Sequence, residues 1–172
     1  MKLKNTRLLG IITIAACAHI NWATAQTNVK QEPRSPCTAA QDIKAPQLYG
    51  MWQVTFTNPP AGLPATATLL LEKHEEFSDS LQGAVTRLLT TEPGASLKKG
   101  HAAKAALAGD VEDGFVILDE SSDNVSISGT WNGQLVENAC GREITGAWKD
   151  TSAGAALDAP DVPFTMRKLS GW

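Results

Sequence analysis

The chain offers few residues whose types and spacing could do chemistry, and its histidines are the first to consider. His74 and His101 lie outside the N-terminal segment, and neither stands at the spacing of a metal site or a catalytic triad. Glu75 and Glu76 follow His74 between two expected strands, where a solvated hairpin tip is the simplest interpretation. The chain has no Gly-x-Ser-x-Gly motif and no phosphate-binding loop. We therefore expect no enzyme activity, no metal and no cofactor.

Two acidic clusters, at residues 110–113 and 119–123, are the other concentrations of charge. Neither cluster has the spacing of a calcium-binding loop. Their simplest interpretation is charged turns that keep the ends of a barrel in contact with water.

A five-residue phrase recurs along the chain: an aliphatic residue, any residue, Gly, any residue, and then a large apolar residue. The phrase ends at Trp52, Trp131 and Trp148, and weaker copies end at Val85 and Val111. In a strand, residues i, i+2 and i+4 share one face, so each phrase places a glycine between two bulky groups on that face. Such alternation of small and large residues suits the interior of a small closed barrel.

Short segments of strand character follow one another, separated by turn signals. The expected strands are residues 48–57, 65–73, 80–89, 105–111, 115–119, 125–131, 134–140, 142–149 and 162–169. Asn132 and Gly133 are a hairpin signal, because a type I′ turn requires positive φ at both positions. Residues 90–101 and 151–161 are expected loops. The pattern predicts an all-β fold, an antiparallel up-and-down barrel of about eight strands.

The first residues have the pattern of a secretory signal peptide. Three basic residues precede an apolar run at residues 8–18, and Ala25 ends a small-x-small cleavage sequence. We therefore expect residues 1–25 to be removed and the protein to be exported to the bacterial periplasm or the extracellular space. The alternative is a bacterial lipobox, in which Cys17 would be lipidated and would anchor the protein to the membrane.

Removal of this leader leaves about 147 residues, enough for one domain with its own core. The leader holds three basic residues and no acidic ones, so the net charge falls from −3 to about −6. A negative balance argues against nucleic acid and anionic membrane surfaces as partners.

The cysteines and prolines set the domain organisation. Loss or lipidation of Cys17 leaves Cys37 and Cys140 as the thiols that can pair, and an oxidising compartment favours a disulfide between them over two buried thiols. Residues 26–46 are polar and contain three prolines, so we expect an extended arm. Residues 47–172 then form the barrel domain.

Part of this pattern resembles the calycin signature shared by lipocalins and avidins. Gly50 and Trp52 lie in the first expected strand, and Arg167 lies in the last. In calycins a basic residue of the final strand packs over the first-strand tryptophan. The resemblance implies a closed barrel in which Arg167 covers Trp52.

The second half of the chain is similar to the avidin and streptavidin family in the order and spacing of its residues. The matching residues are a Ser-Gly-Thr-Trp sequence that ends at Trp131, a Thr-Gly-Ala-Trp sequence that ends at Trp148, and Asp161 before the last strand. The resemblance implies that the two tryptophans wall a ligand site and that Asp161 contacts the polar part of the ligand.

The departures from that family concern the ligand. Val54, Val85 and Arg87 stand where the family has Asn, Tyr and Ser for the ureido group of biotin, and Gly129 stands where a hydroxyl is usual. Each hydrogen bond left unmade to a buried polar head group costs about 1–3 kcal/mol. The resemblance therefore implies the fold more strongly than it implies biotin as the ligand.

Two functions follow from these residues. The first is the binding of a small apolar or amphipathic molecule at an open barrel end lined by Trp52, Trp131 and Trp148, with Asp161 at its rim. The same tryptophans could instead simply fill the interior, which in an eight-stranded barrel is only just wide enough for side chains. The second is a protein-binding module, such as a periplasmic protease inhibitor that inserts its N-terminal arm into the target.

Residues 69–71 and 115–118 are apolar at consecutive positions, which is more than burial on one side of a strand requires. Loops or the arm could cover Leu70, Val116 and Leu118. Alternatively these residues form an outer wall through which the protein assembles as a homo-oligomer.

Overall fold

The computed structural model describes residues 37–88 and 102–171. The expected signal peptide, residues 26–36 of the expected arm and the whole of the expected loop at residues 90–101 lie outside this part of the chain. Within the described residues, no helix is long and apolar enough to cross a membrane.

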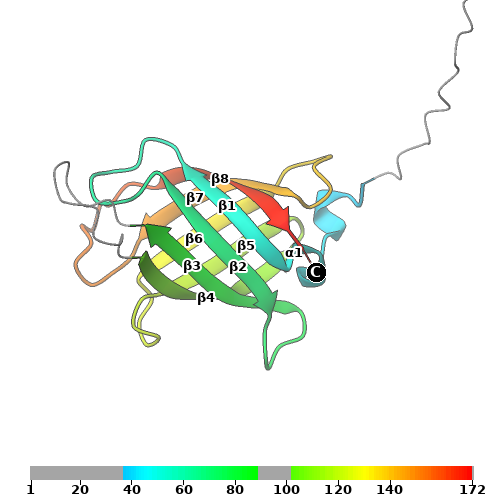
Figure 1. Ribbon diagram of the computed structural model, residues 1–172, viewed down its shortest axis with the longest axis horizontal. Coiled ribbons are helices and arrows are strands. Elements are labelled where there is room, and N and C mark those ends of the chain that lie inside the picture. The colour runs from blue at the N-terminus through cyan, green and yellow to red at the C-terminus, as the bar shows by residue number, and fades with distance from the viewer. Residues whose placement is uncertain (1–36, 89–101, 172) are drawn as a thin grey trace, which may run out of the picture. The chain divides into compact units, whose positions relative to one another are not determined.

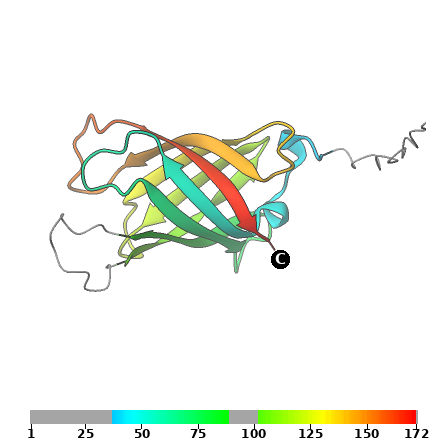
Figure 2. The same cartoon turned by 45° about the horizontal axis from the view of Figure 1, so that its top comes forward.

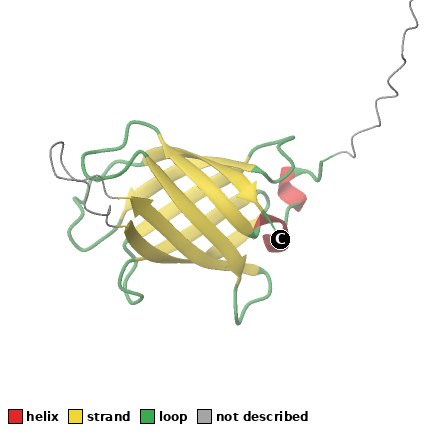
Figure 3. Ribbon diagram, in the orientation of Figure 1, coloured by secondary structure: helices red, strands yellow, loops and turns green. Residues whose placement is uncertain are grey.

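Within these residues, antiparallel strands close into a single barrel in which each strand pairs with its neighbours in sequence and the last strand pairs with the first. The strands are β1 (Gly50–Phe56), β2 (Thr66–Lys73), β3 (Ser80–Leu88), β4 (Ala102–Glu112), β5 (Phe115–Ser121), β6 (Gly129–Leu135), β7 (Glu143–Asp150) and β8 (Val162–Ser170). Figure 1 shows the strands tilted around the barrel, and Figure 3 shows that strands form its whole wall. The predicted fold class is confirmed.

Alternation along each strand separates the core from the outer surface. On β5, for example, Val116 and Leu118 are buried, whereas Phe115 and Ile117 are half exposed. The prediction that Val116 and Leu118 belong to an outer wall is therefore wrong. Alternation along β5 places Val116 and Leu118 on the inner face and Phe115 and Ile117 on the outer face.

The recurring glycines lie where neighbouring strands approach too closely for a side chain. A Cβ on Gly83 would lie 1.9 Å from the carbonyl oxygen of Leu70 on β2, and a Cβ on Gly146 would lie 2.1 Å from that of Asn132 on β6. No real Cβ atom tolerates such contacts, so glycine is required at both positions. Glycines of this kind let the strands bend sharply into a closed barrel.

The predicted hairpin at Asn132 and Gly133 is wrong, because both residues lie within β6. Gly133 faces the interior, where a Cβ would lie 2.6 Å from a methyl carbon of Ile144 on β7. The turn between β6 and β7 comes later, at residues 136–142, where Asn138 and Cys140 have positive φ. The expected strands at residues 125–131 and 134–140 are therefore one strand, which begins at Gly129.

One end of the barrel, which we call the helix end, is covered by residues 40–48. This segment contains a 3-10 helix (Ala40–Asp42) and a one-turn helix α1 (Ala45–Leu48). Ala40, Ile43 and Leu48 are buried in the core, so residues 37–46 of the expected arm are packed against the barrel rather than extended.

The predicted disulfide joins Cys37 to Cys140, which are 103 residues apart in the sequence. It ties the start of the covering segment to the turn between β6 and β7, the same turn in which a Cβ on Gly141 would contact Ile43. The segment that closes the helix end is therefore held at both of its ends. The disulfide holds it at Cys37, and its other end continues directly into β1.

The opposite end, which we call the loop end, carries the longer connections. Residues 57–65 join β1 to β2, residues 122–128 join β5 to β6, and residues 151–161 join β7 to β8. Figure 2 shows these connections gathered at the end of the barrel away from α1.

Candidate functional site

A charged pair lies inside the barrel near the loop end. Arg87 on β3 is 8% exposed and Glu120 on β5 is 3% exposed, and they are the charged residues buried within the described part of the chain. The guanidinium donates two hydrogen bonds to the carboxylate, from Nη1 to Oε1 at 2.5 Å and from Nη2 to Oε2 at 2.7 Å. This two-point pairing fixes the orientation of both groups.

Two tryptophans complete the cluster. The Nε1 groups of Trp131 and Trp148 both donate to Oε2 of Glu120, at 3.0 and 3.1 Å. The guanidinium carbon of Arg87 lies 5.5 Å from the ring centroid of Trp131 and 5.2 Å from that of Trp148, which adds cation–π attraction. Glu120 therefore accepts four hydrogen bonds in a site from which water is largely excluded.

Further aromatic rings pack behind the two indoles. The ring centroids of Trp131 and Trp148 are 6.3 Å apart, and Phe56 on β1 lies 5.6 Å from Trp131 and 6.2 Å from Trp148. Phe164 on β8 packs edge-on against Trp131 at 5.2 Å. These aromatic residues fill the β1, β6, β7 and β8 side of the interior.

Strand alternation explains why Arg87 and Glu120 point inward. Leu81, Val85 and Arg87 share the inner face of β3, and Leu118 and Glu120 share that of β5. Strand β4 lies between β3 and β5. On β4, Ala103 pairs with Arg87 and Leu107 pairs with Glu120, so the buried Ala105 lies between these two levels, and its small side chain leaves room for the long arginine to reach across to Glu120.

Close packing at Gly129 positions the indole of Trp148. Gly129 pairs with Glu120 across the β5–β6 ladder, and a Cβ at Gly129 would lie 2.6 Å from Nε1 of Trp148. Without a side chain at this position, the indole N–H of Trp148 can reach the Glu120 carboxylate.

The backbone of Glu120 is held by the connection that follows it. Its carbonyl oxygen accepts hydrogen bonds from the amide of Ser128 at 2.7 Å and from the Ser128 hydroxyl at 3.3 Å. The hydroxyl of Ser122 hydrogen-bonds the same Ser128 hydroxyl at 2.8 Å. The connection between β5 and β6 therefore fixes the backbone of Glu120, from which its carboxylate projects into the barrel.

Asp123 organises the exposed part of that connection. Its carboxylate accepts hydrogen bonds from the Ser126 hydroxyl and from the amides of Ser126 and Val125. These hydrogen bonds, led by the one from the Ser126 hydroxyl, hold the pKa of Asp123 well below its ordinary value. The hydrogen bonds of the Asp123 carboxylate, rather than the burial of apolar side chains, thus hold the connection between β5 and β6 in its conformation.

The structure brings together two of the three tryptophans predicted to line the site. Trp131 and Trp148 lie side by side at the loop end, as described above. Trp52 lies toward the helix end, where it is fully buried and donates a hydrogen bond to the Leu48 carbonyl of α1 at 2.8 Å. Trp52 therefore contributes to the closure of the helix end.

The basic residue over Trp52 is Lys168, and the prediction of Arg167 is wrong. Lys168 pairs with Trp52 across the β1–β8 ladder, and its Nζ lies 5.8 Å from the ring centroid while donating to the Gln47 carbonyl at 2.6 Å. Burial, and secondarily the charge of Arg142, lowers the pKa of Lys168. The Arg167 side chain is 72% exposed on the outer face. The one-residue difference follows from strand parity, because Phe164 and Met166 face inward.

Asp161 lies at the loop end, immediately before Val162, which pairs with Trp148 across the β7–β8 ladder. It is exposed to solvent, and none of the hydrogen bonds and ion pairs of the described residues involves it. Asp161 thus lies near the strand position of Trp148 without being part of the buried cluster.

Sequence reasoning did not place Glu120 and Arg87 in the site. The prediction that Glu120 belongs to a charged turn is wrong, because β5 continues to Ser121. The signal that could have identified it is the alternation of Val116, Leu118 and Glu120. Arg87 departs from the avidin pattern, and its strand parity with Leu81 and Val85 is the signal that places it on the inner face.

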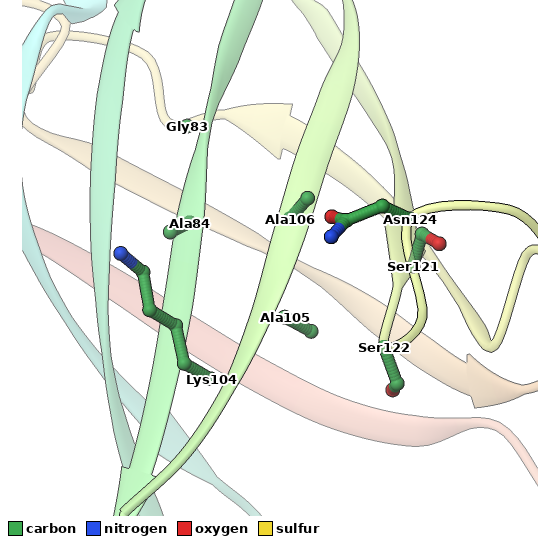
Figure 4. Close-up of a pocket in the computed structure, with 8 residues that line it drawn as sticks. All are labelled: Gly83, Ala84, Lys104, Ala105, Ala106, Ser121, Ser122 and Asn124. Atoms are coloured by element: carbon green, nitrogen blue, oxygen red, sulfur yellow. The ribbon is translucent and has the colours of Figure 1, made fainter.

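The outer wall carries several hollows. One of about 320 Å³ lies over β3, β4 and the end of β5 and is lined by small residues together with Lys104, Ser121, Ser122 and Asn124. In Figure 4 these polar side chains surround the alanines of β3 and β4 rather than converge on a single point. Because no charged pair or buried polar group is present there, we place the candidate site inside the barrel.

Within the part of the chain that the structure describes, no group of three His, Cys, Asp or Glu side chains could hold a metal ion. The described residues form a closed barrel of eight antiparallel strands, which is consistent with a calycin-like fold, and a buried Arg–Glu pair is held by tryptophans at one end of it. No known protein-family model matches the sequence, and a search of curated proteins finds no match.

Proposed function

We propose that this protein is an exported binding protein without catalytic activity, and that it takes up a small amphipathic molecule at the loop end of the barrel. The observation that carries the proposal is the interior cluster of Arg87, Glu120, Trp131 and Trp148. Binding sites for small molecules combine apolar aromatic walls with a few oriented polar groups, and this cluster supplies both.

The arrangement favours binding over catalysis. Four donors occupy the two oxygens of Glu120, so this carboxylate acts as a fixed acceptor rather than as a base that takes a proton from a substrate. The export part of the proposal rests on the leader pattern and is supported by the disulfide, which forms in oxidising compartments.

The experiment is native mass spectrometry of the protein purified from its host, followed by tryptophan fluorescence titration with biotin, fatty acids and haem. A ligand at the loop end should quench the emission of Trp131 and Trp148. The variant Trp131→Phe should reduce the change in signal. The matched control Trp52→Phe, at the other end of the barrel, should leave it intact.

A filled interior is the rival explanation and gives different results. Because Trp131 is 1% exposed, Trp131→Ala should lose about 3–5 kcal/mol of stability as a large-to-small core change under either explanation, and the ligand measurements decide between them. With a filled interior, no ligand would co-purify, and none of the three compounds would quench the fluorescence. That combination of results would exclude the binding function.

We also propose that the protein self-associates through the outer face of β5. Phe115 and Ile117 are 50% and 54% exposed, and they line a hollow of about 400 Å³ together with Asn132 and Thr145 of the neighbouring strands. Light scattering should show a species larger than the monomer, and the double variant F115S/I117S should shift it to the monomer. A strict monomer at high wild-type concentration would contradict the proposal.

A further inference from the structure

The Arg87 guanidinium is only partly used by its contacts within the protein. Its two terminal nitrogens pair with Glu120, whereas Nε is buried and has no hydrogen-bond partner. A guanidinium has five N–H donors in one plane. When a carboxylate occupies the end of the group, the side edge still presents the Nε–H and one Nη–H in parallel, as a second fork for an acceptor.

Small side chains flank Arg87 on both neighbouring strands. The register places Ala103 of β4 opposite Arg87, and on β2 it pairs Thr68 with Thr86, so Ala67 is the next residue beside Arg87. The aromatic rings gather instead on β1, β6, β7 and β8. By strand alternation Ala103 belongs to the inner face, yet it is exposed, so the rim of the barrel beside Arg87 is open to solvent, while the Nε atom of Arg87 lies buried just inside it.

The charge balance of the cluster determines which acceptor fits best. Glu120 already neutralises Arg87, so a second anion at the side edge would add an uncompensated charge to a largely desolvated site, which is costly. A neutral carbonyl group can accept the same two hydrogen bonds without adding a charge. It also satisfies the buried Nε–H, which otherwise carries a desolvation penalty.

We propose that the loop end recognises a neutral carbonyl head group, such as a carboxamide, on the side edge of Arg87, with the apolar part of the molecule against Trp131 and Trp148. This inference rests on the proposed binding function and specifies its ligand class. Glu120 is then a positioning residue, which holds the guanidinium so that its free edge is available.

The test compares three probes with the same eight-carbon chain at pH 7.5: octanamide, octanoate and octylammonium. Binding is measured by quenching of tryptophan fluorescence and by calorimetry. We expect octanamide to bind at least about fivefold more tightly than either charged probe, since one net hydrogen bond is worth about that factor. The variant Arg87→Lys keeps the charge but has no planar fork, so it should lose this preference.

Two further variants keep the result interpretable if Arg87→Lys folds poorly. The double variant R87M/E120Q removes both charges together and should bind the three probes without preference for the amide. The control Arg167→Lys alters an exposed arginine on the outer face and should bind as the wild type does.

The remaining outcomes separate the two proposals. If the wild type binds all three probes alike, or binds octanoate most tightly, the head-group assignment is overturned while a binding function stands. If the amide preference survives in the Arg87 variants, the assignment to Arg87 is wrong. If none of the probes binds and no ligand co-purifies with the protein, both proposals fail.

Discussion

The buried pair of Arg87 and Glu120 makes a quantitative prediction about stability. Glu120→Gln removes the negative charge and leaves the Arg87 cation buried without a counter-charge. Removing one partner of a buried ion pair costs about 3–5 kcal/mol. We expect Arg87→Met to cost about 3 kcal/mol, at the lower end of that range, because the indoles of Trp131 and Trp148 still donate to the carboxylate.

The double variant R87M/E120Q should be much less destabilised than the sum of the single variants. It leaves no buried charge, and the oxygen of the new amide can still accept a hydrogen bond from an indole N–H. We therefore expect a loss of only about 1–3 kcal/mol, with a coupling free energy of about 3 kcal/mol or more between the two sites.

The assay is urea unfolding at 25 °C with the disulfide intact, followed by far-UV circular dichroism, because the substitutions alter tryptophan fluorescence directly. Equal m-values across the four proteins would show that the same unfolding transition is being compared. The control is the exposed pair of Arg167 and Glu143, whose closest N–O distance is 3.6 Å. The same cycle at these residues should give less than about 1 kcal/mol of coupling. Additive effects at Arg87 and Glu120, within about 0.5 kcal/mol, would refute the reasoning.

Three other predictions concern the features around the cluster. Gly129→Ala should cost about 1–3 kcal/mol in urea unfolding and should shift the indole N–H resonance of Trp148, because the new Cβ would lie 2.6 Å from the indole nitrogen. The control Gly154→Ala should change neither quantity, because a Cβ there would have no neighbouring atom within 4 Å. Reduction of the disulfide should remove up to about 4–5 kcal/mol of stability by the chain-entropy relation for a loop of 103 residues, and an unchanged midpoint would contradict this. Because the pKa of Asp123 is lowered in the folded state, its stabilisation of the loop should be complete above its ordinary value of 3.8 and fade as the pH falls below it. Hydrogen exchange at the amides of residues 125–126 checks this, and Asp123→Ala should remove the protection at every pH.

The architecture could be predicted from the sequence because the signals for a barrel are local. The repeated glycine phrases and the short alternating segments each reflect the geometry of a single strand, and they add up to the same closed wall. The disulfide could be predicted as well, because the number of cysteines left few pairings.

The predictions that failed concern residues whose local sequence fits two structures, and contacts with another strand decide which of the two forms. Asn132 and Gly133 have the composition of a hairpin turn, yet Gly133 is needed inside β6, where Ile144 leaves no room for a side chain. Arg167 and Lys168 are adjacent basic residues, and only the pairing of β8 with β1 decides that Lys168 faces Trp52. In each case the choice depends on a neighbouring strand distant in the sequence.

The candidate site was the hardest feature to predict, because its central residues depart from the pattern that revealed the fold. Arg87 and Glu120 occupy inner positions that alternation assigns to apolar residues, so each alone resembles a polar residue at a strand end. They are 33 residues apart and lie on strands that are not neighbours, and Ala105 on the strand between them permits their contact. A buried charged pair of this kind is weak evidence for stability, since apolar residues of similar volume often stabilise a core as well or better. Its presence at the loop end, with one guanidinium edge unused, is therefore the feature on which we base the proposal that this end of the barrel recognises a ligand.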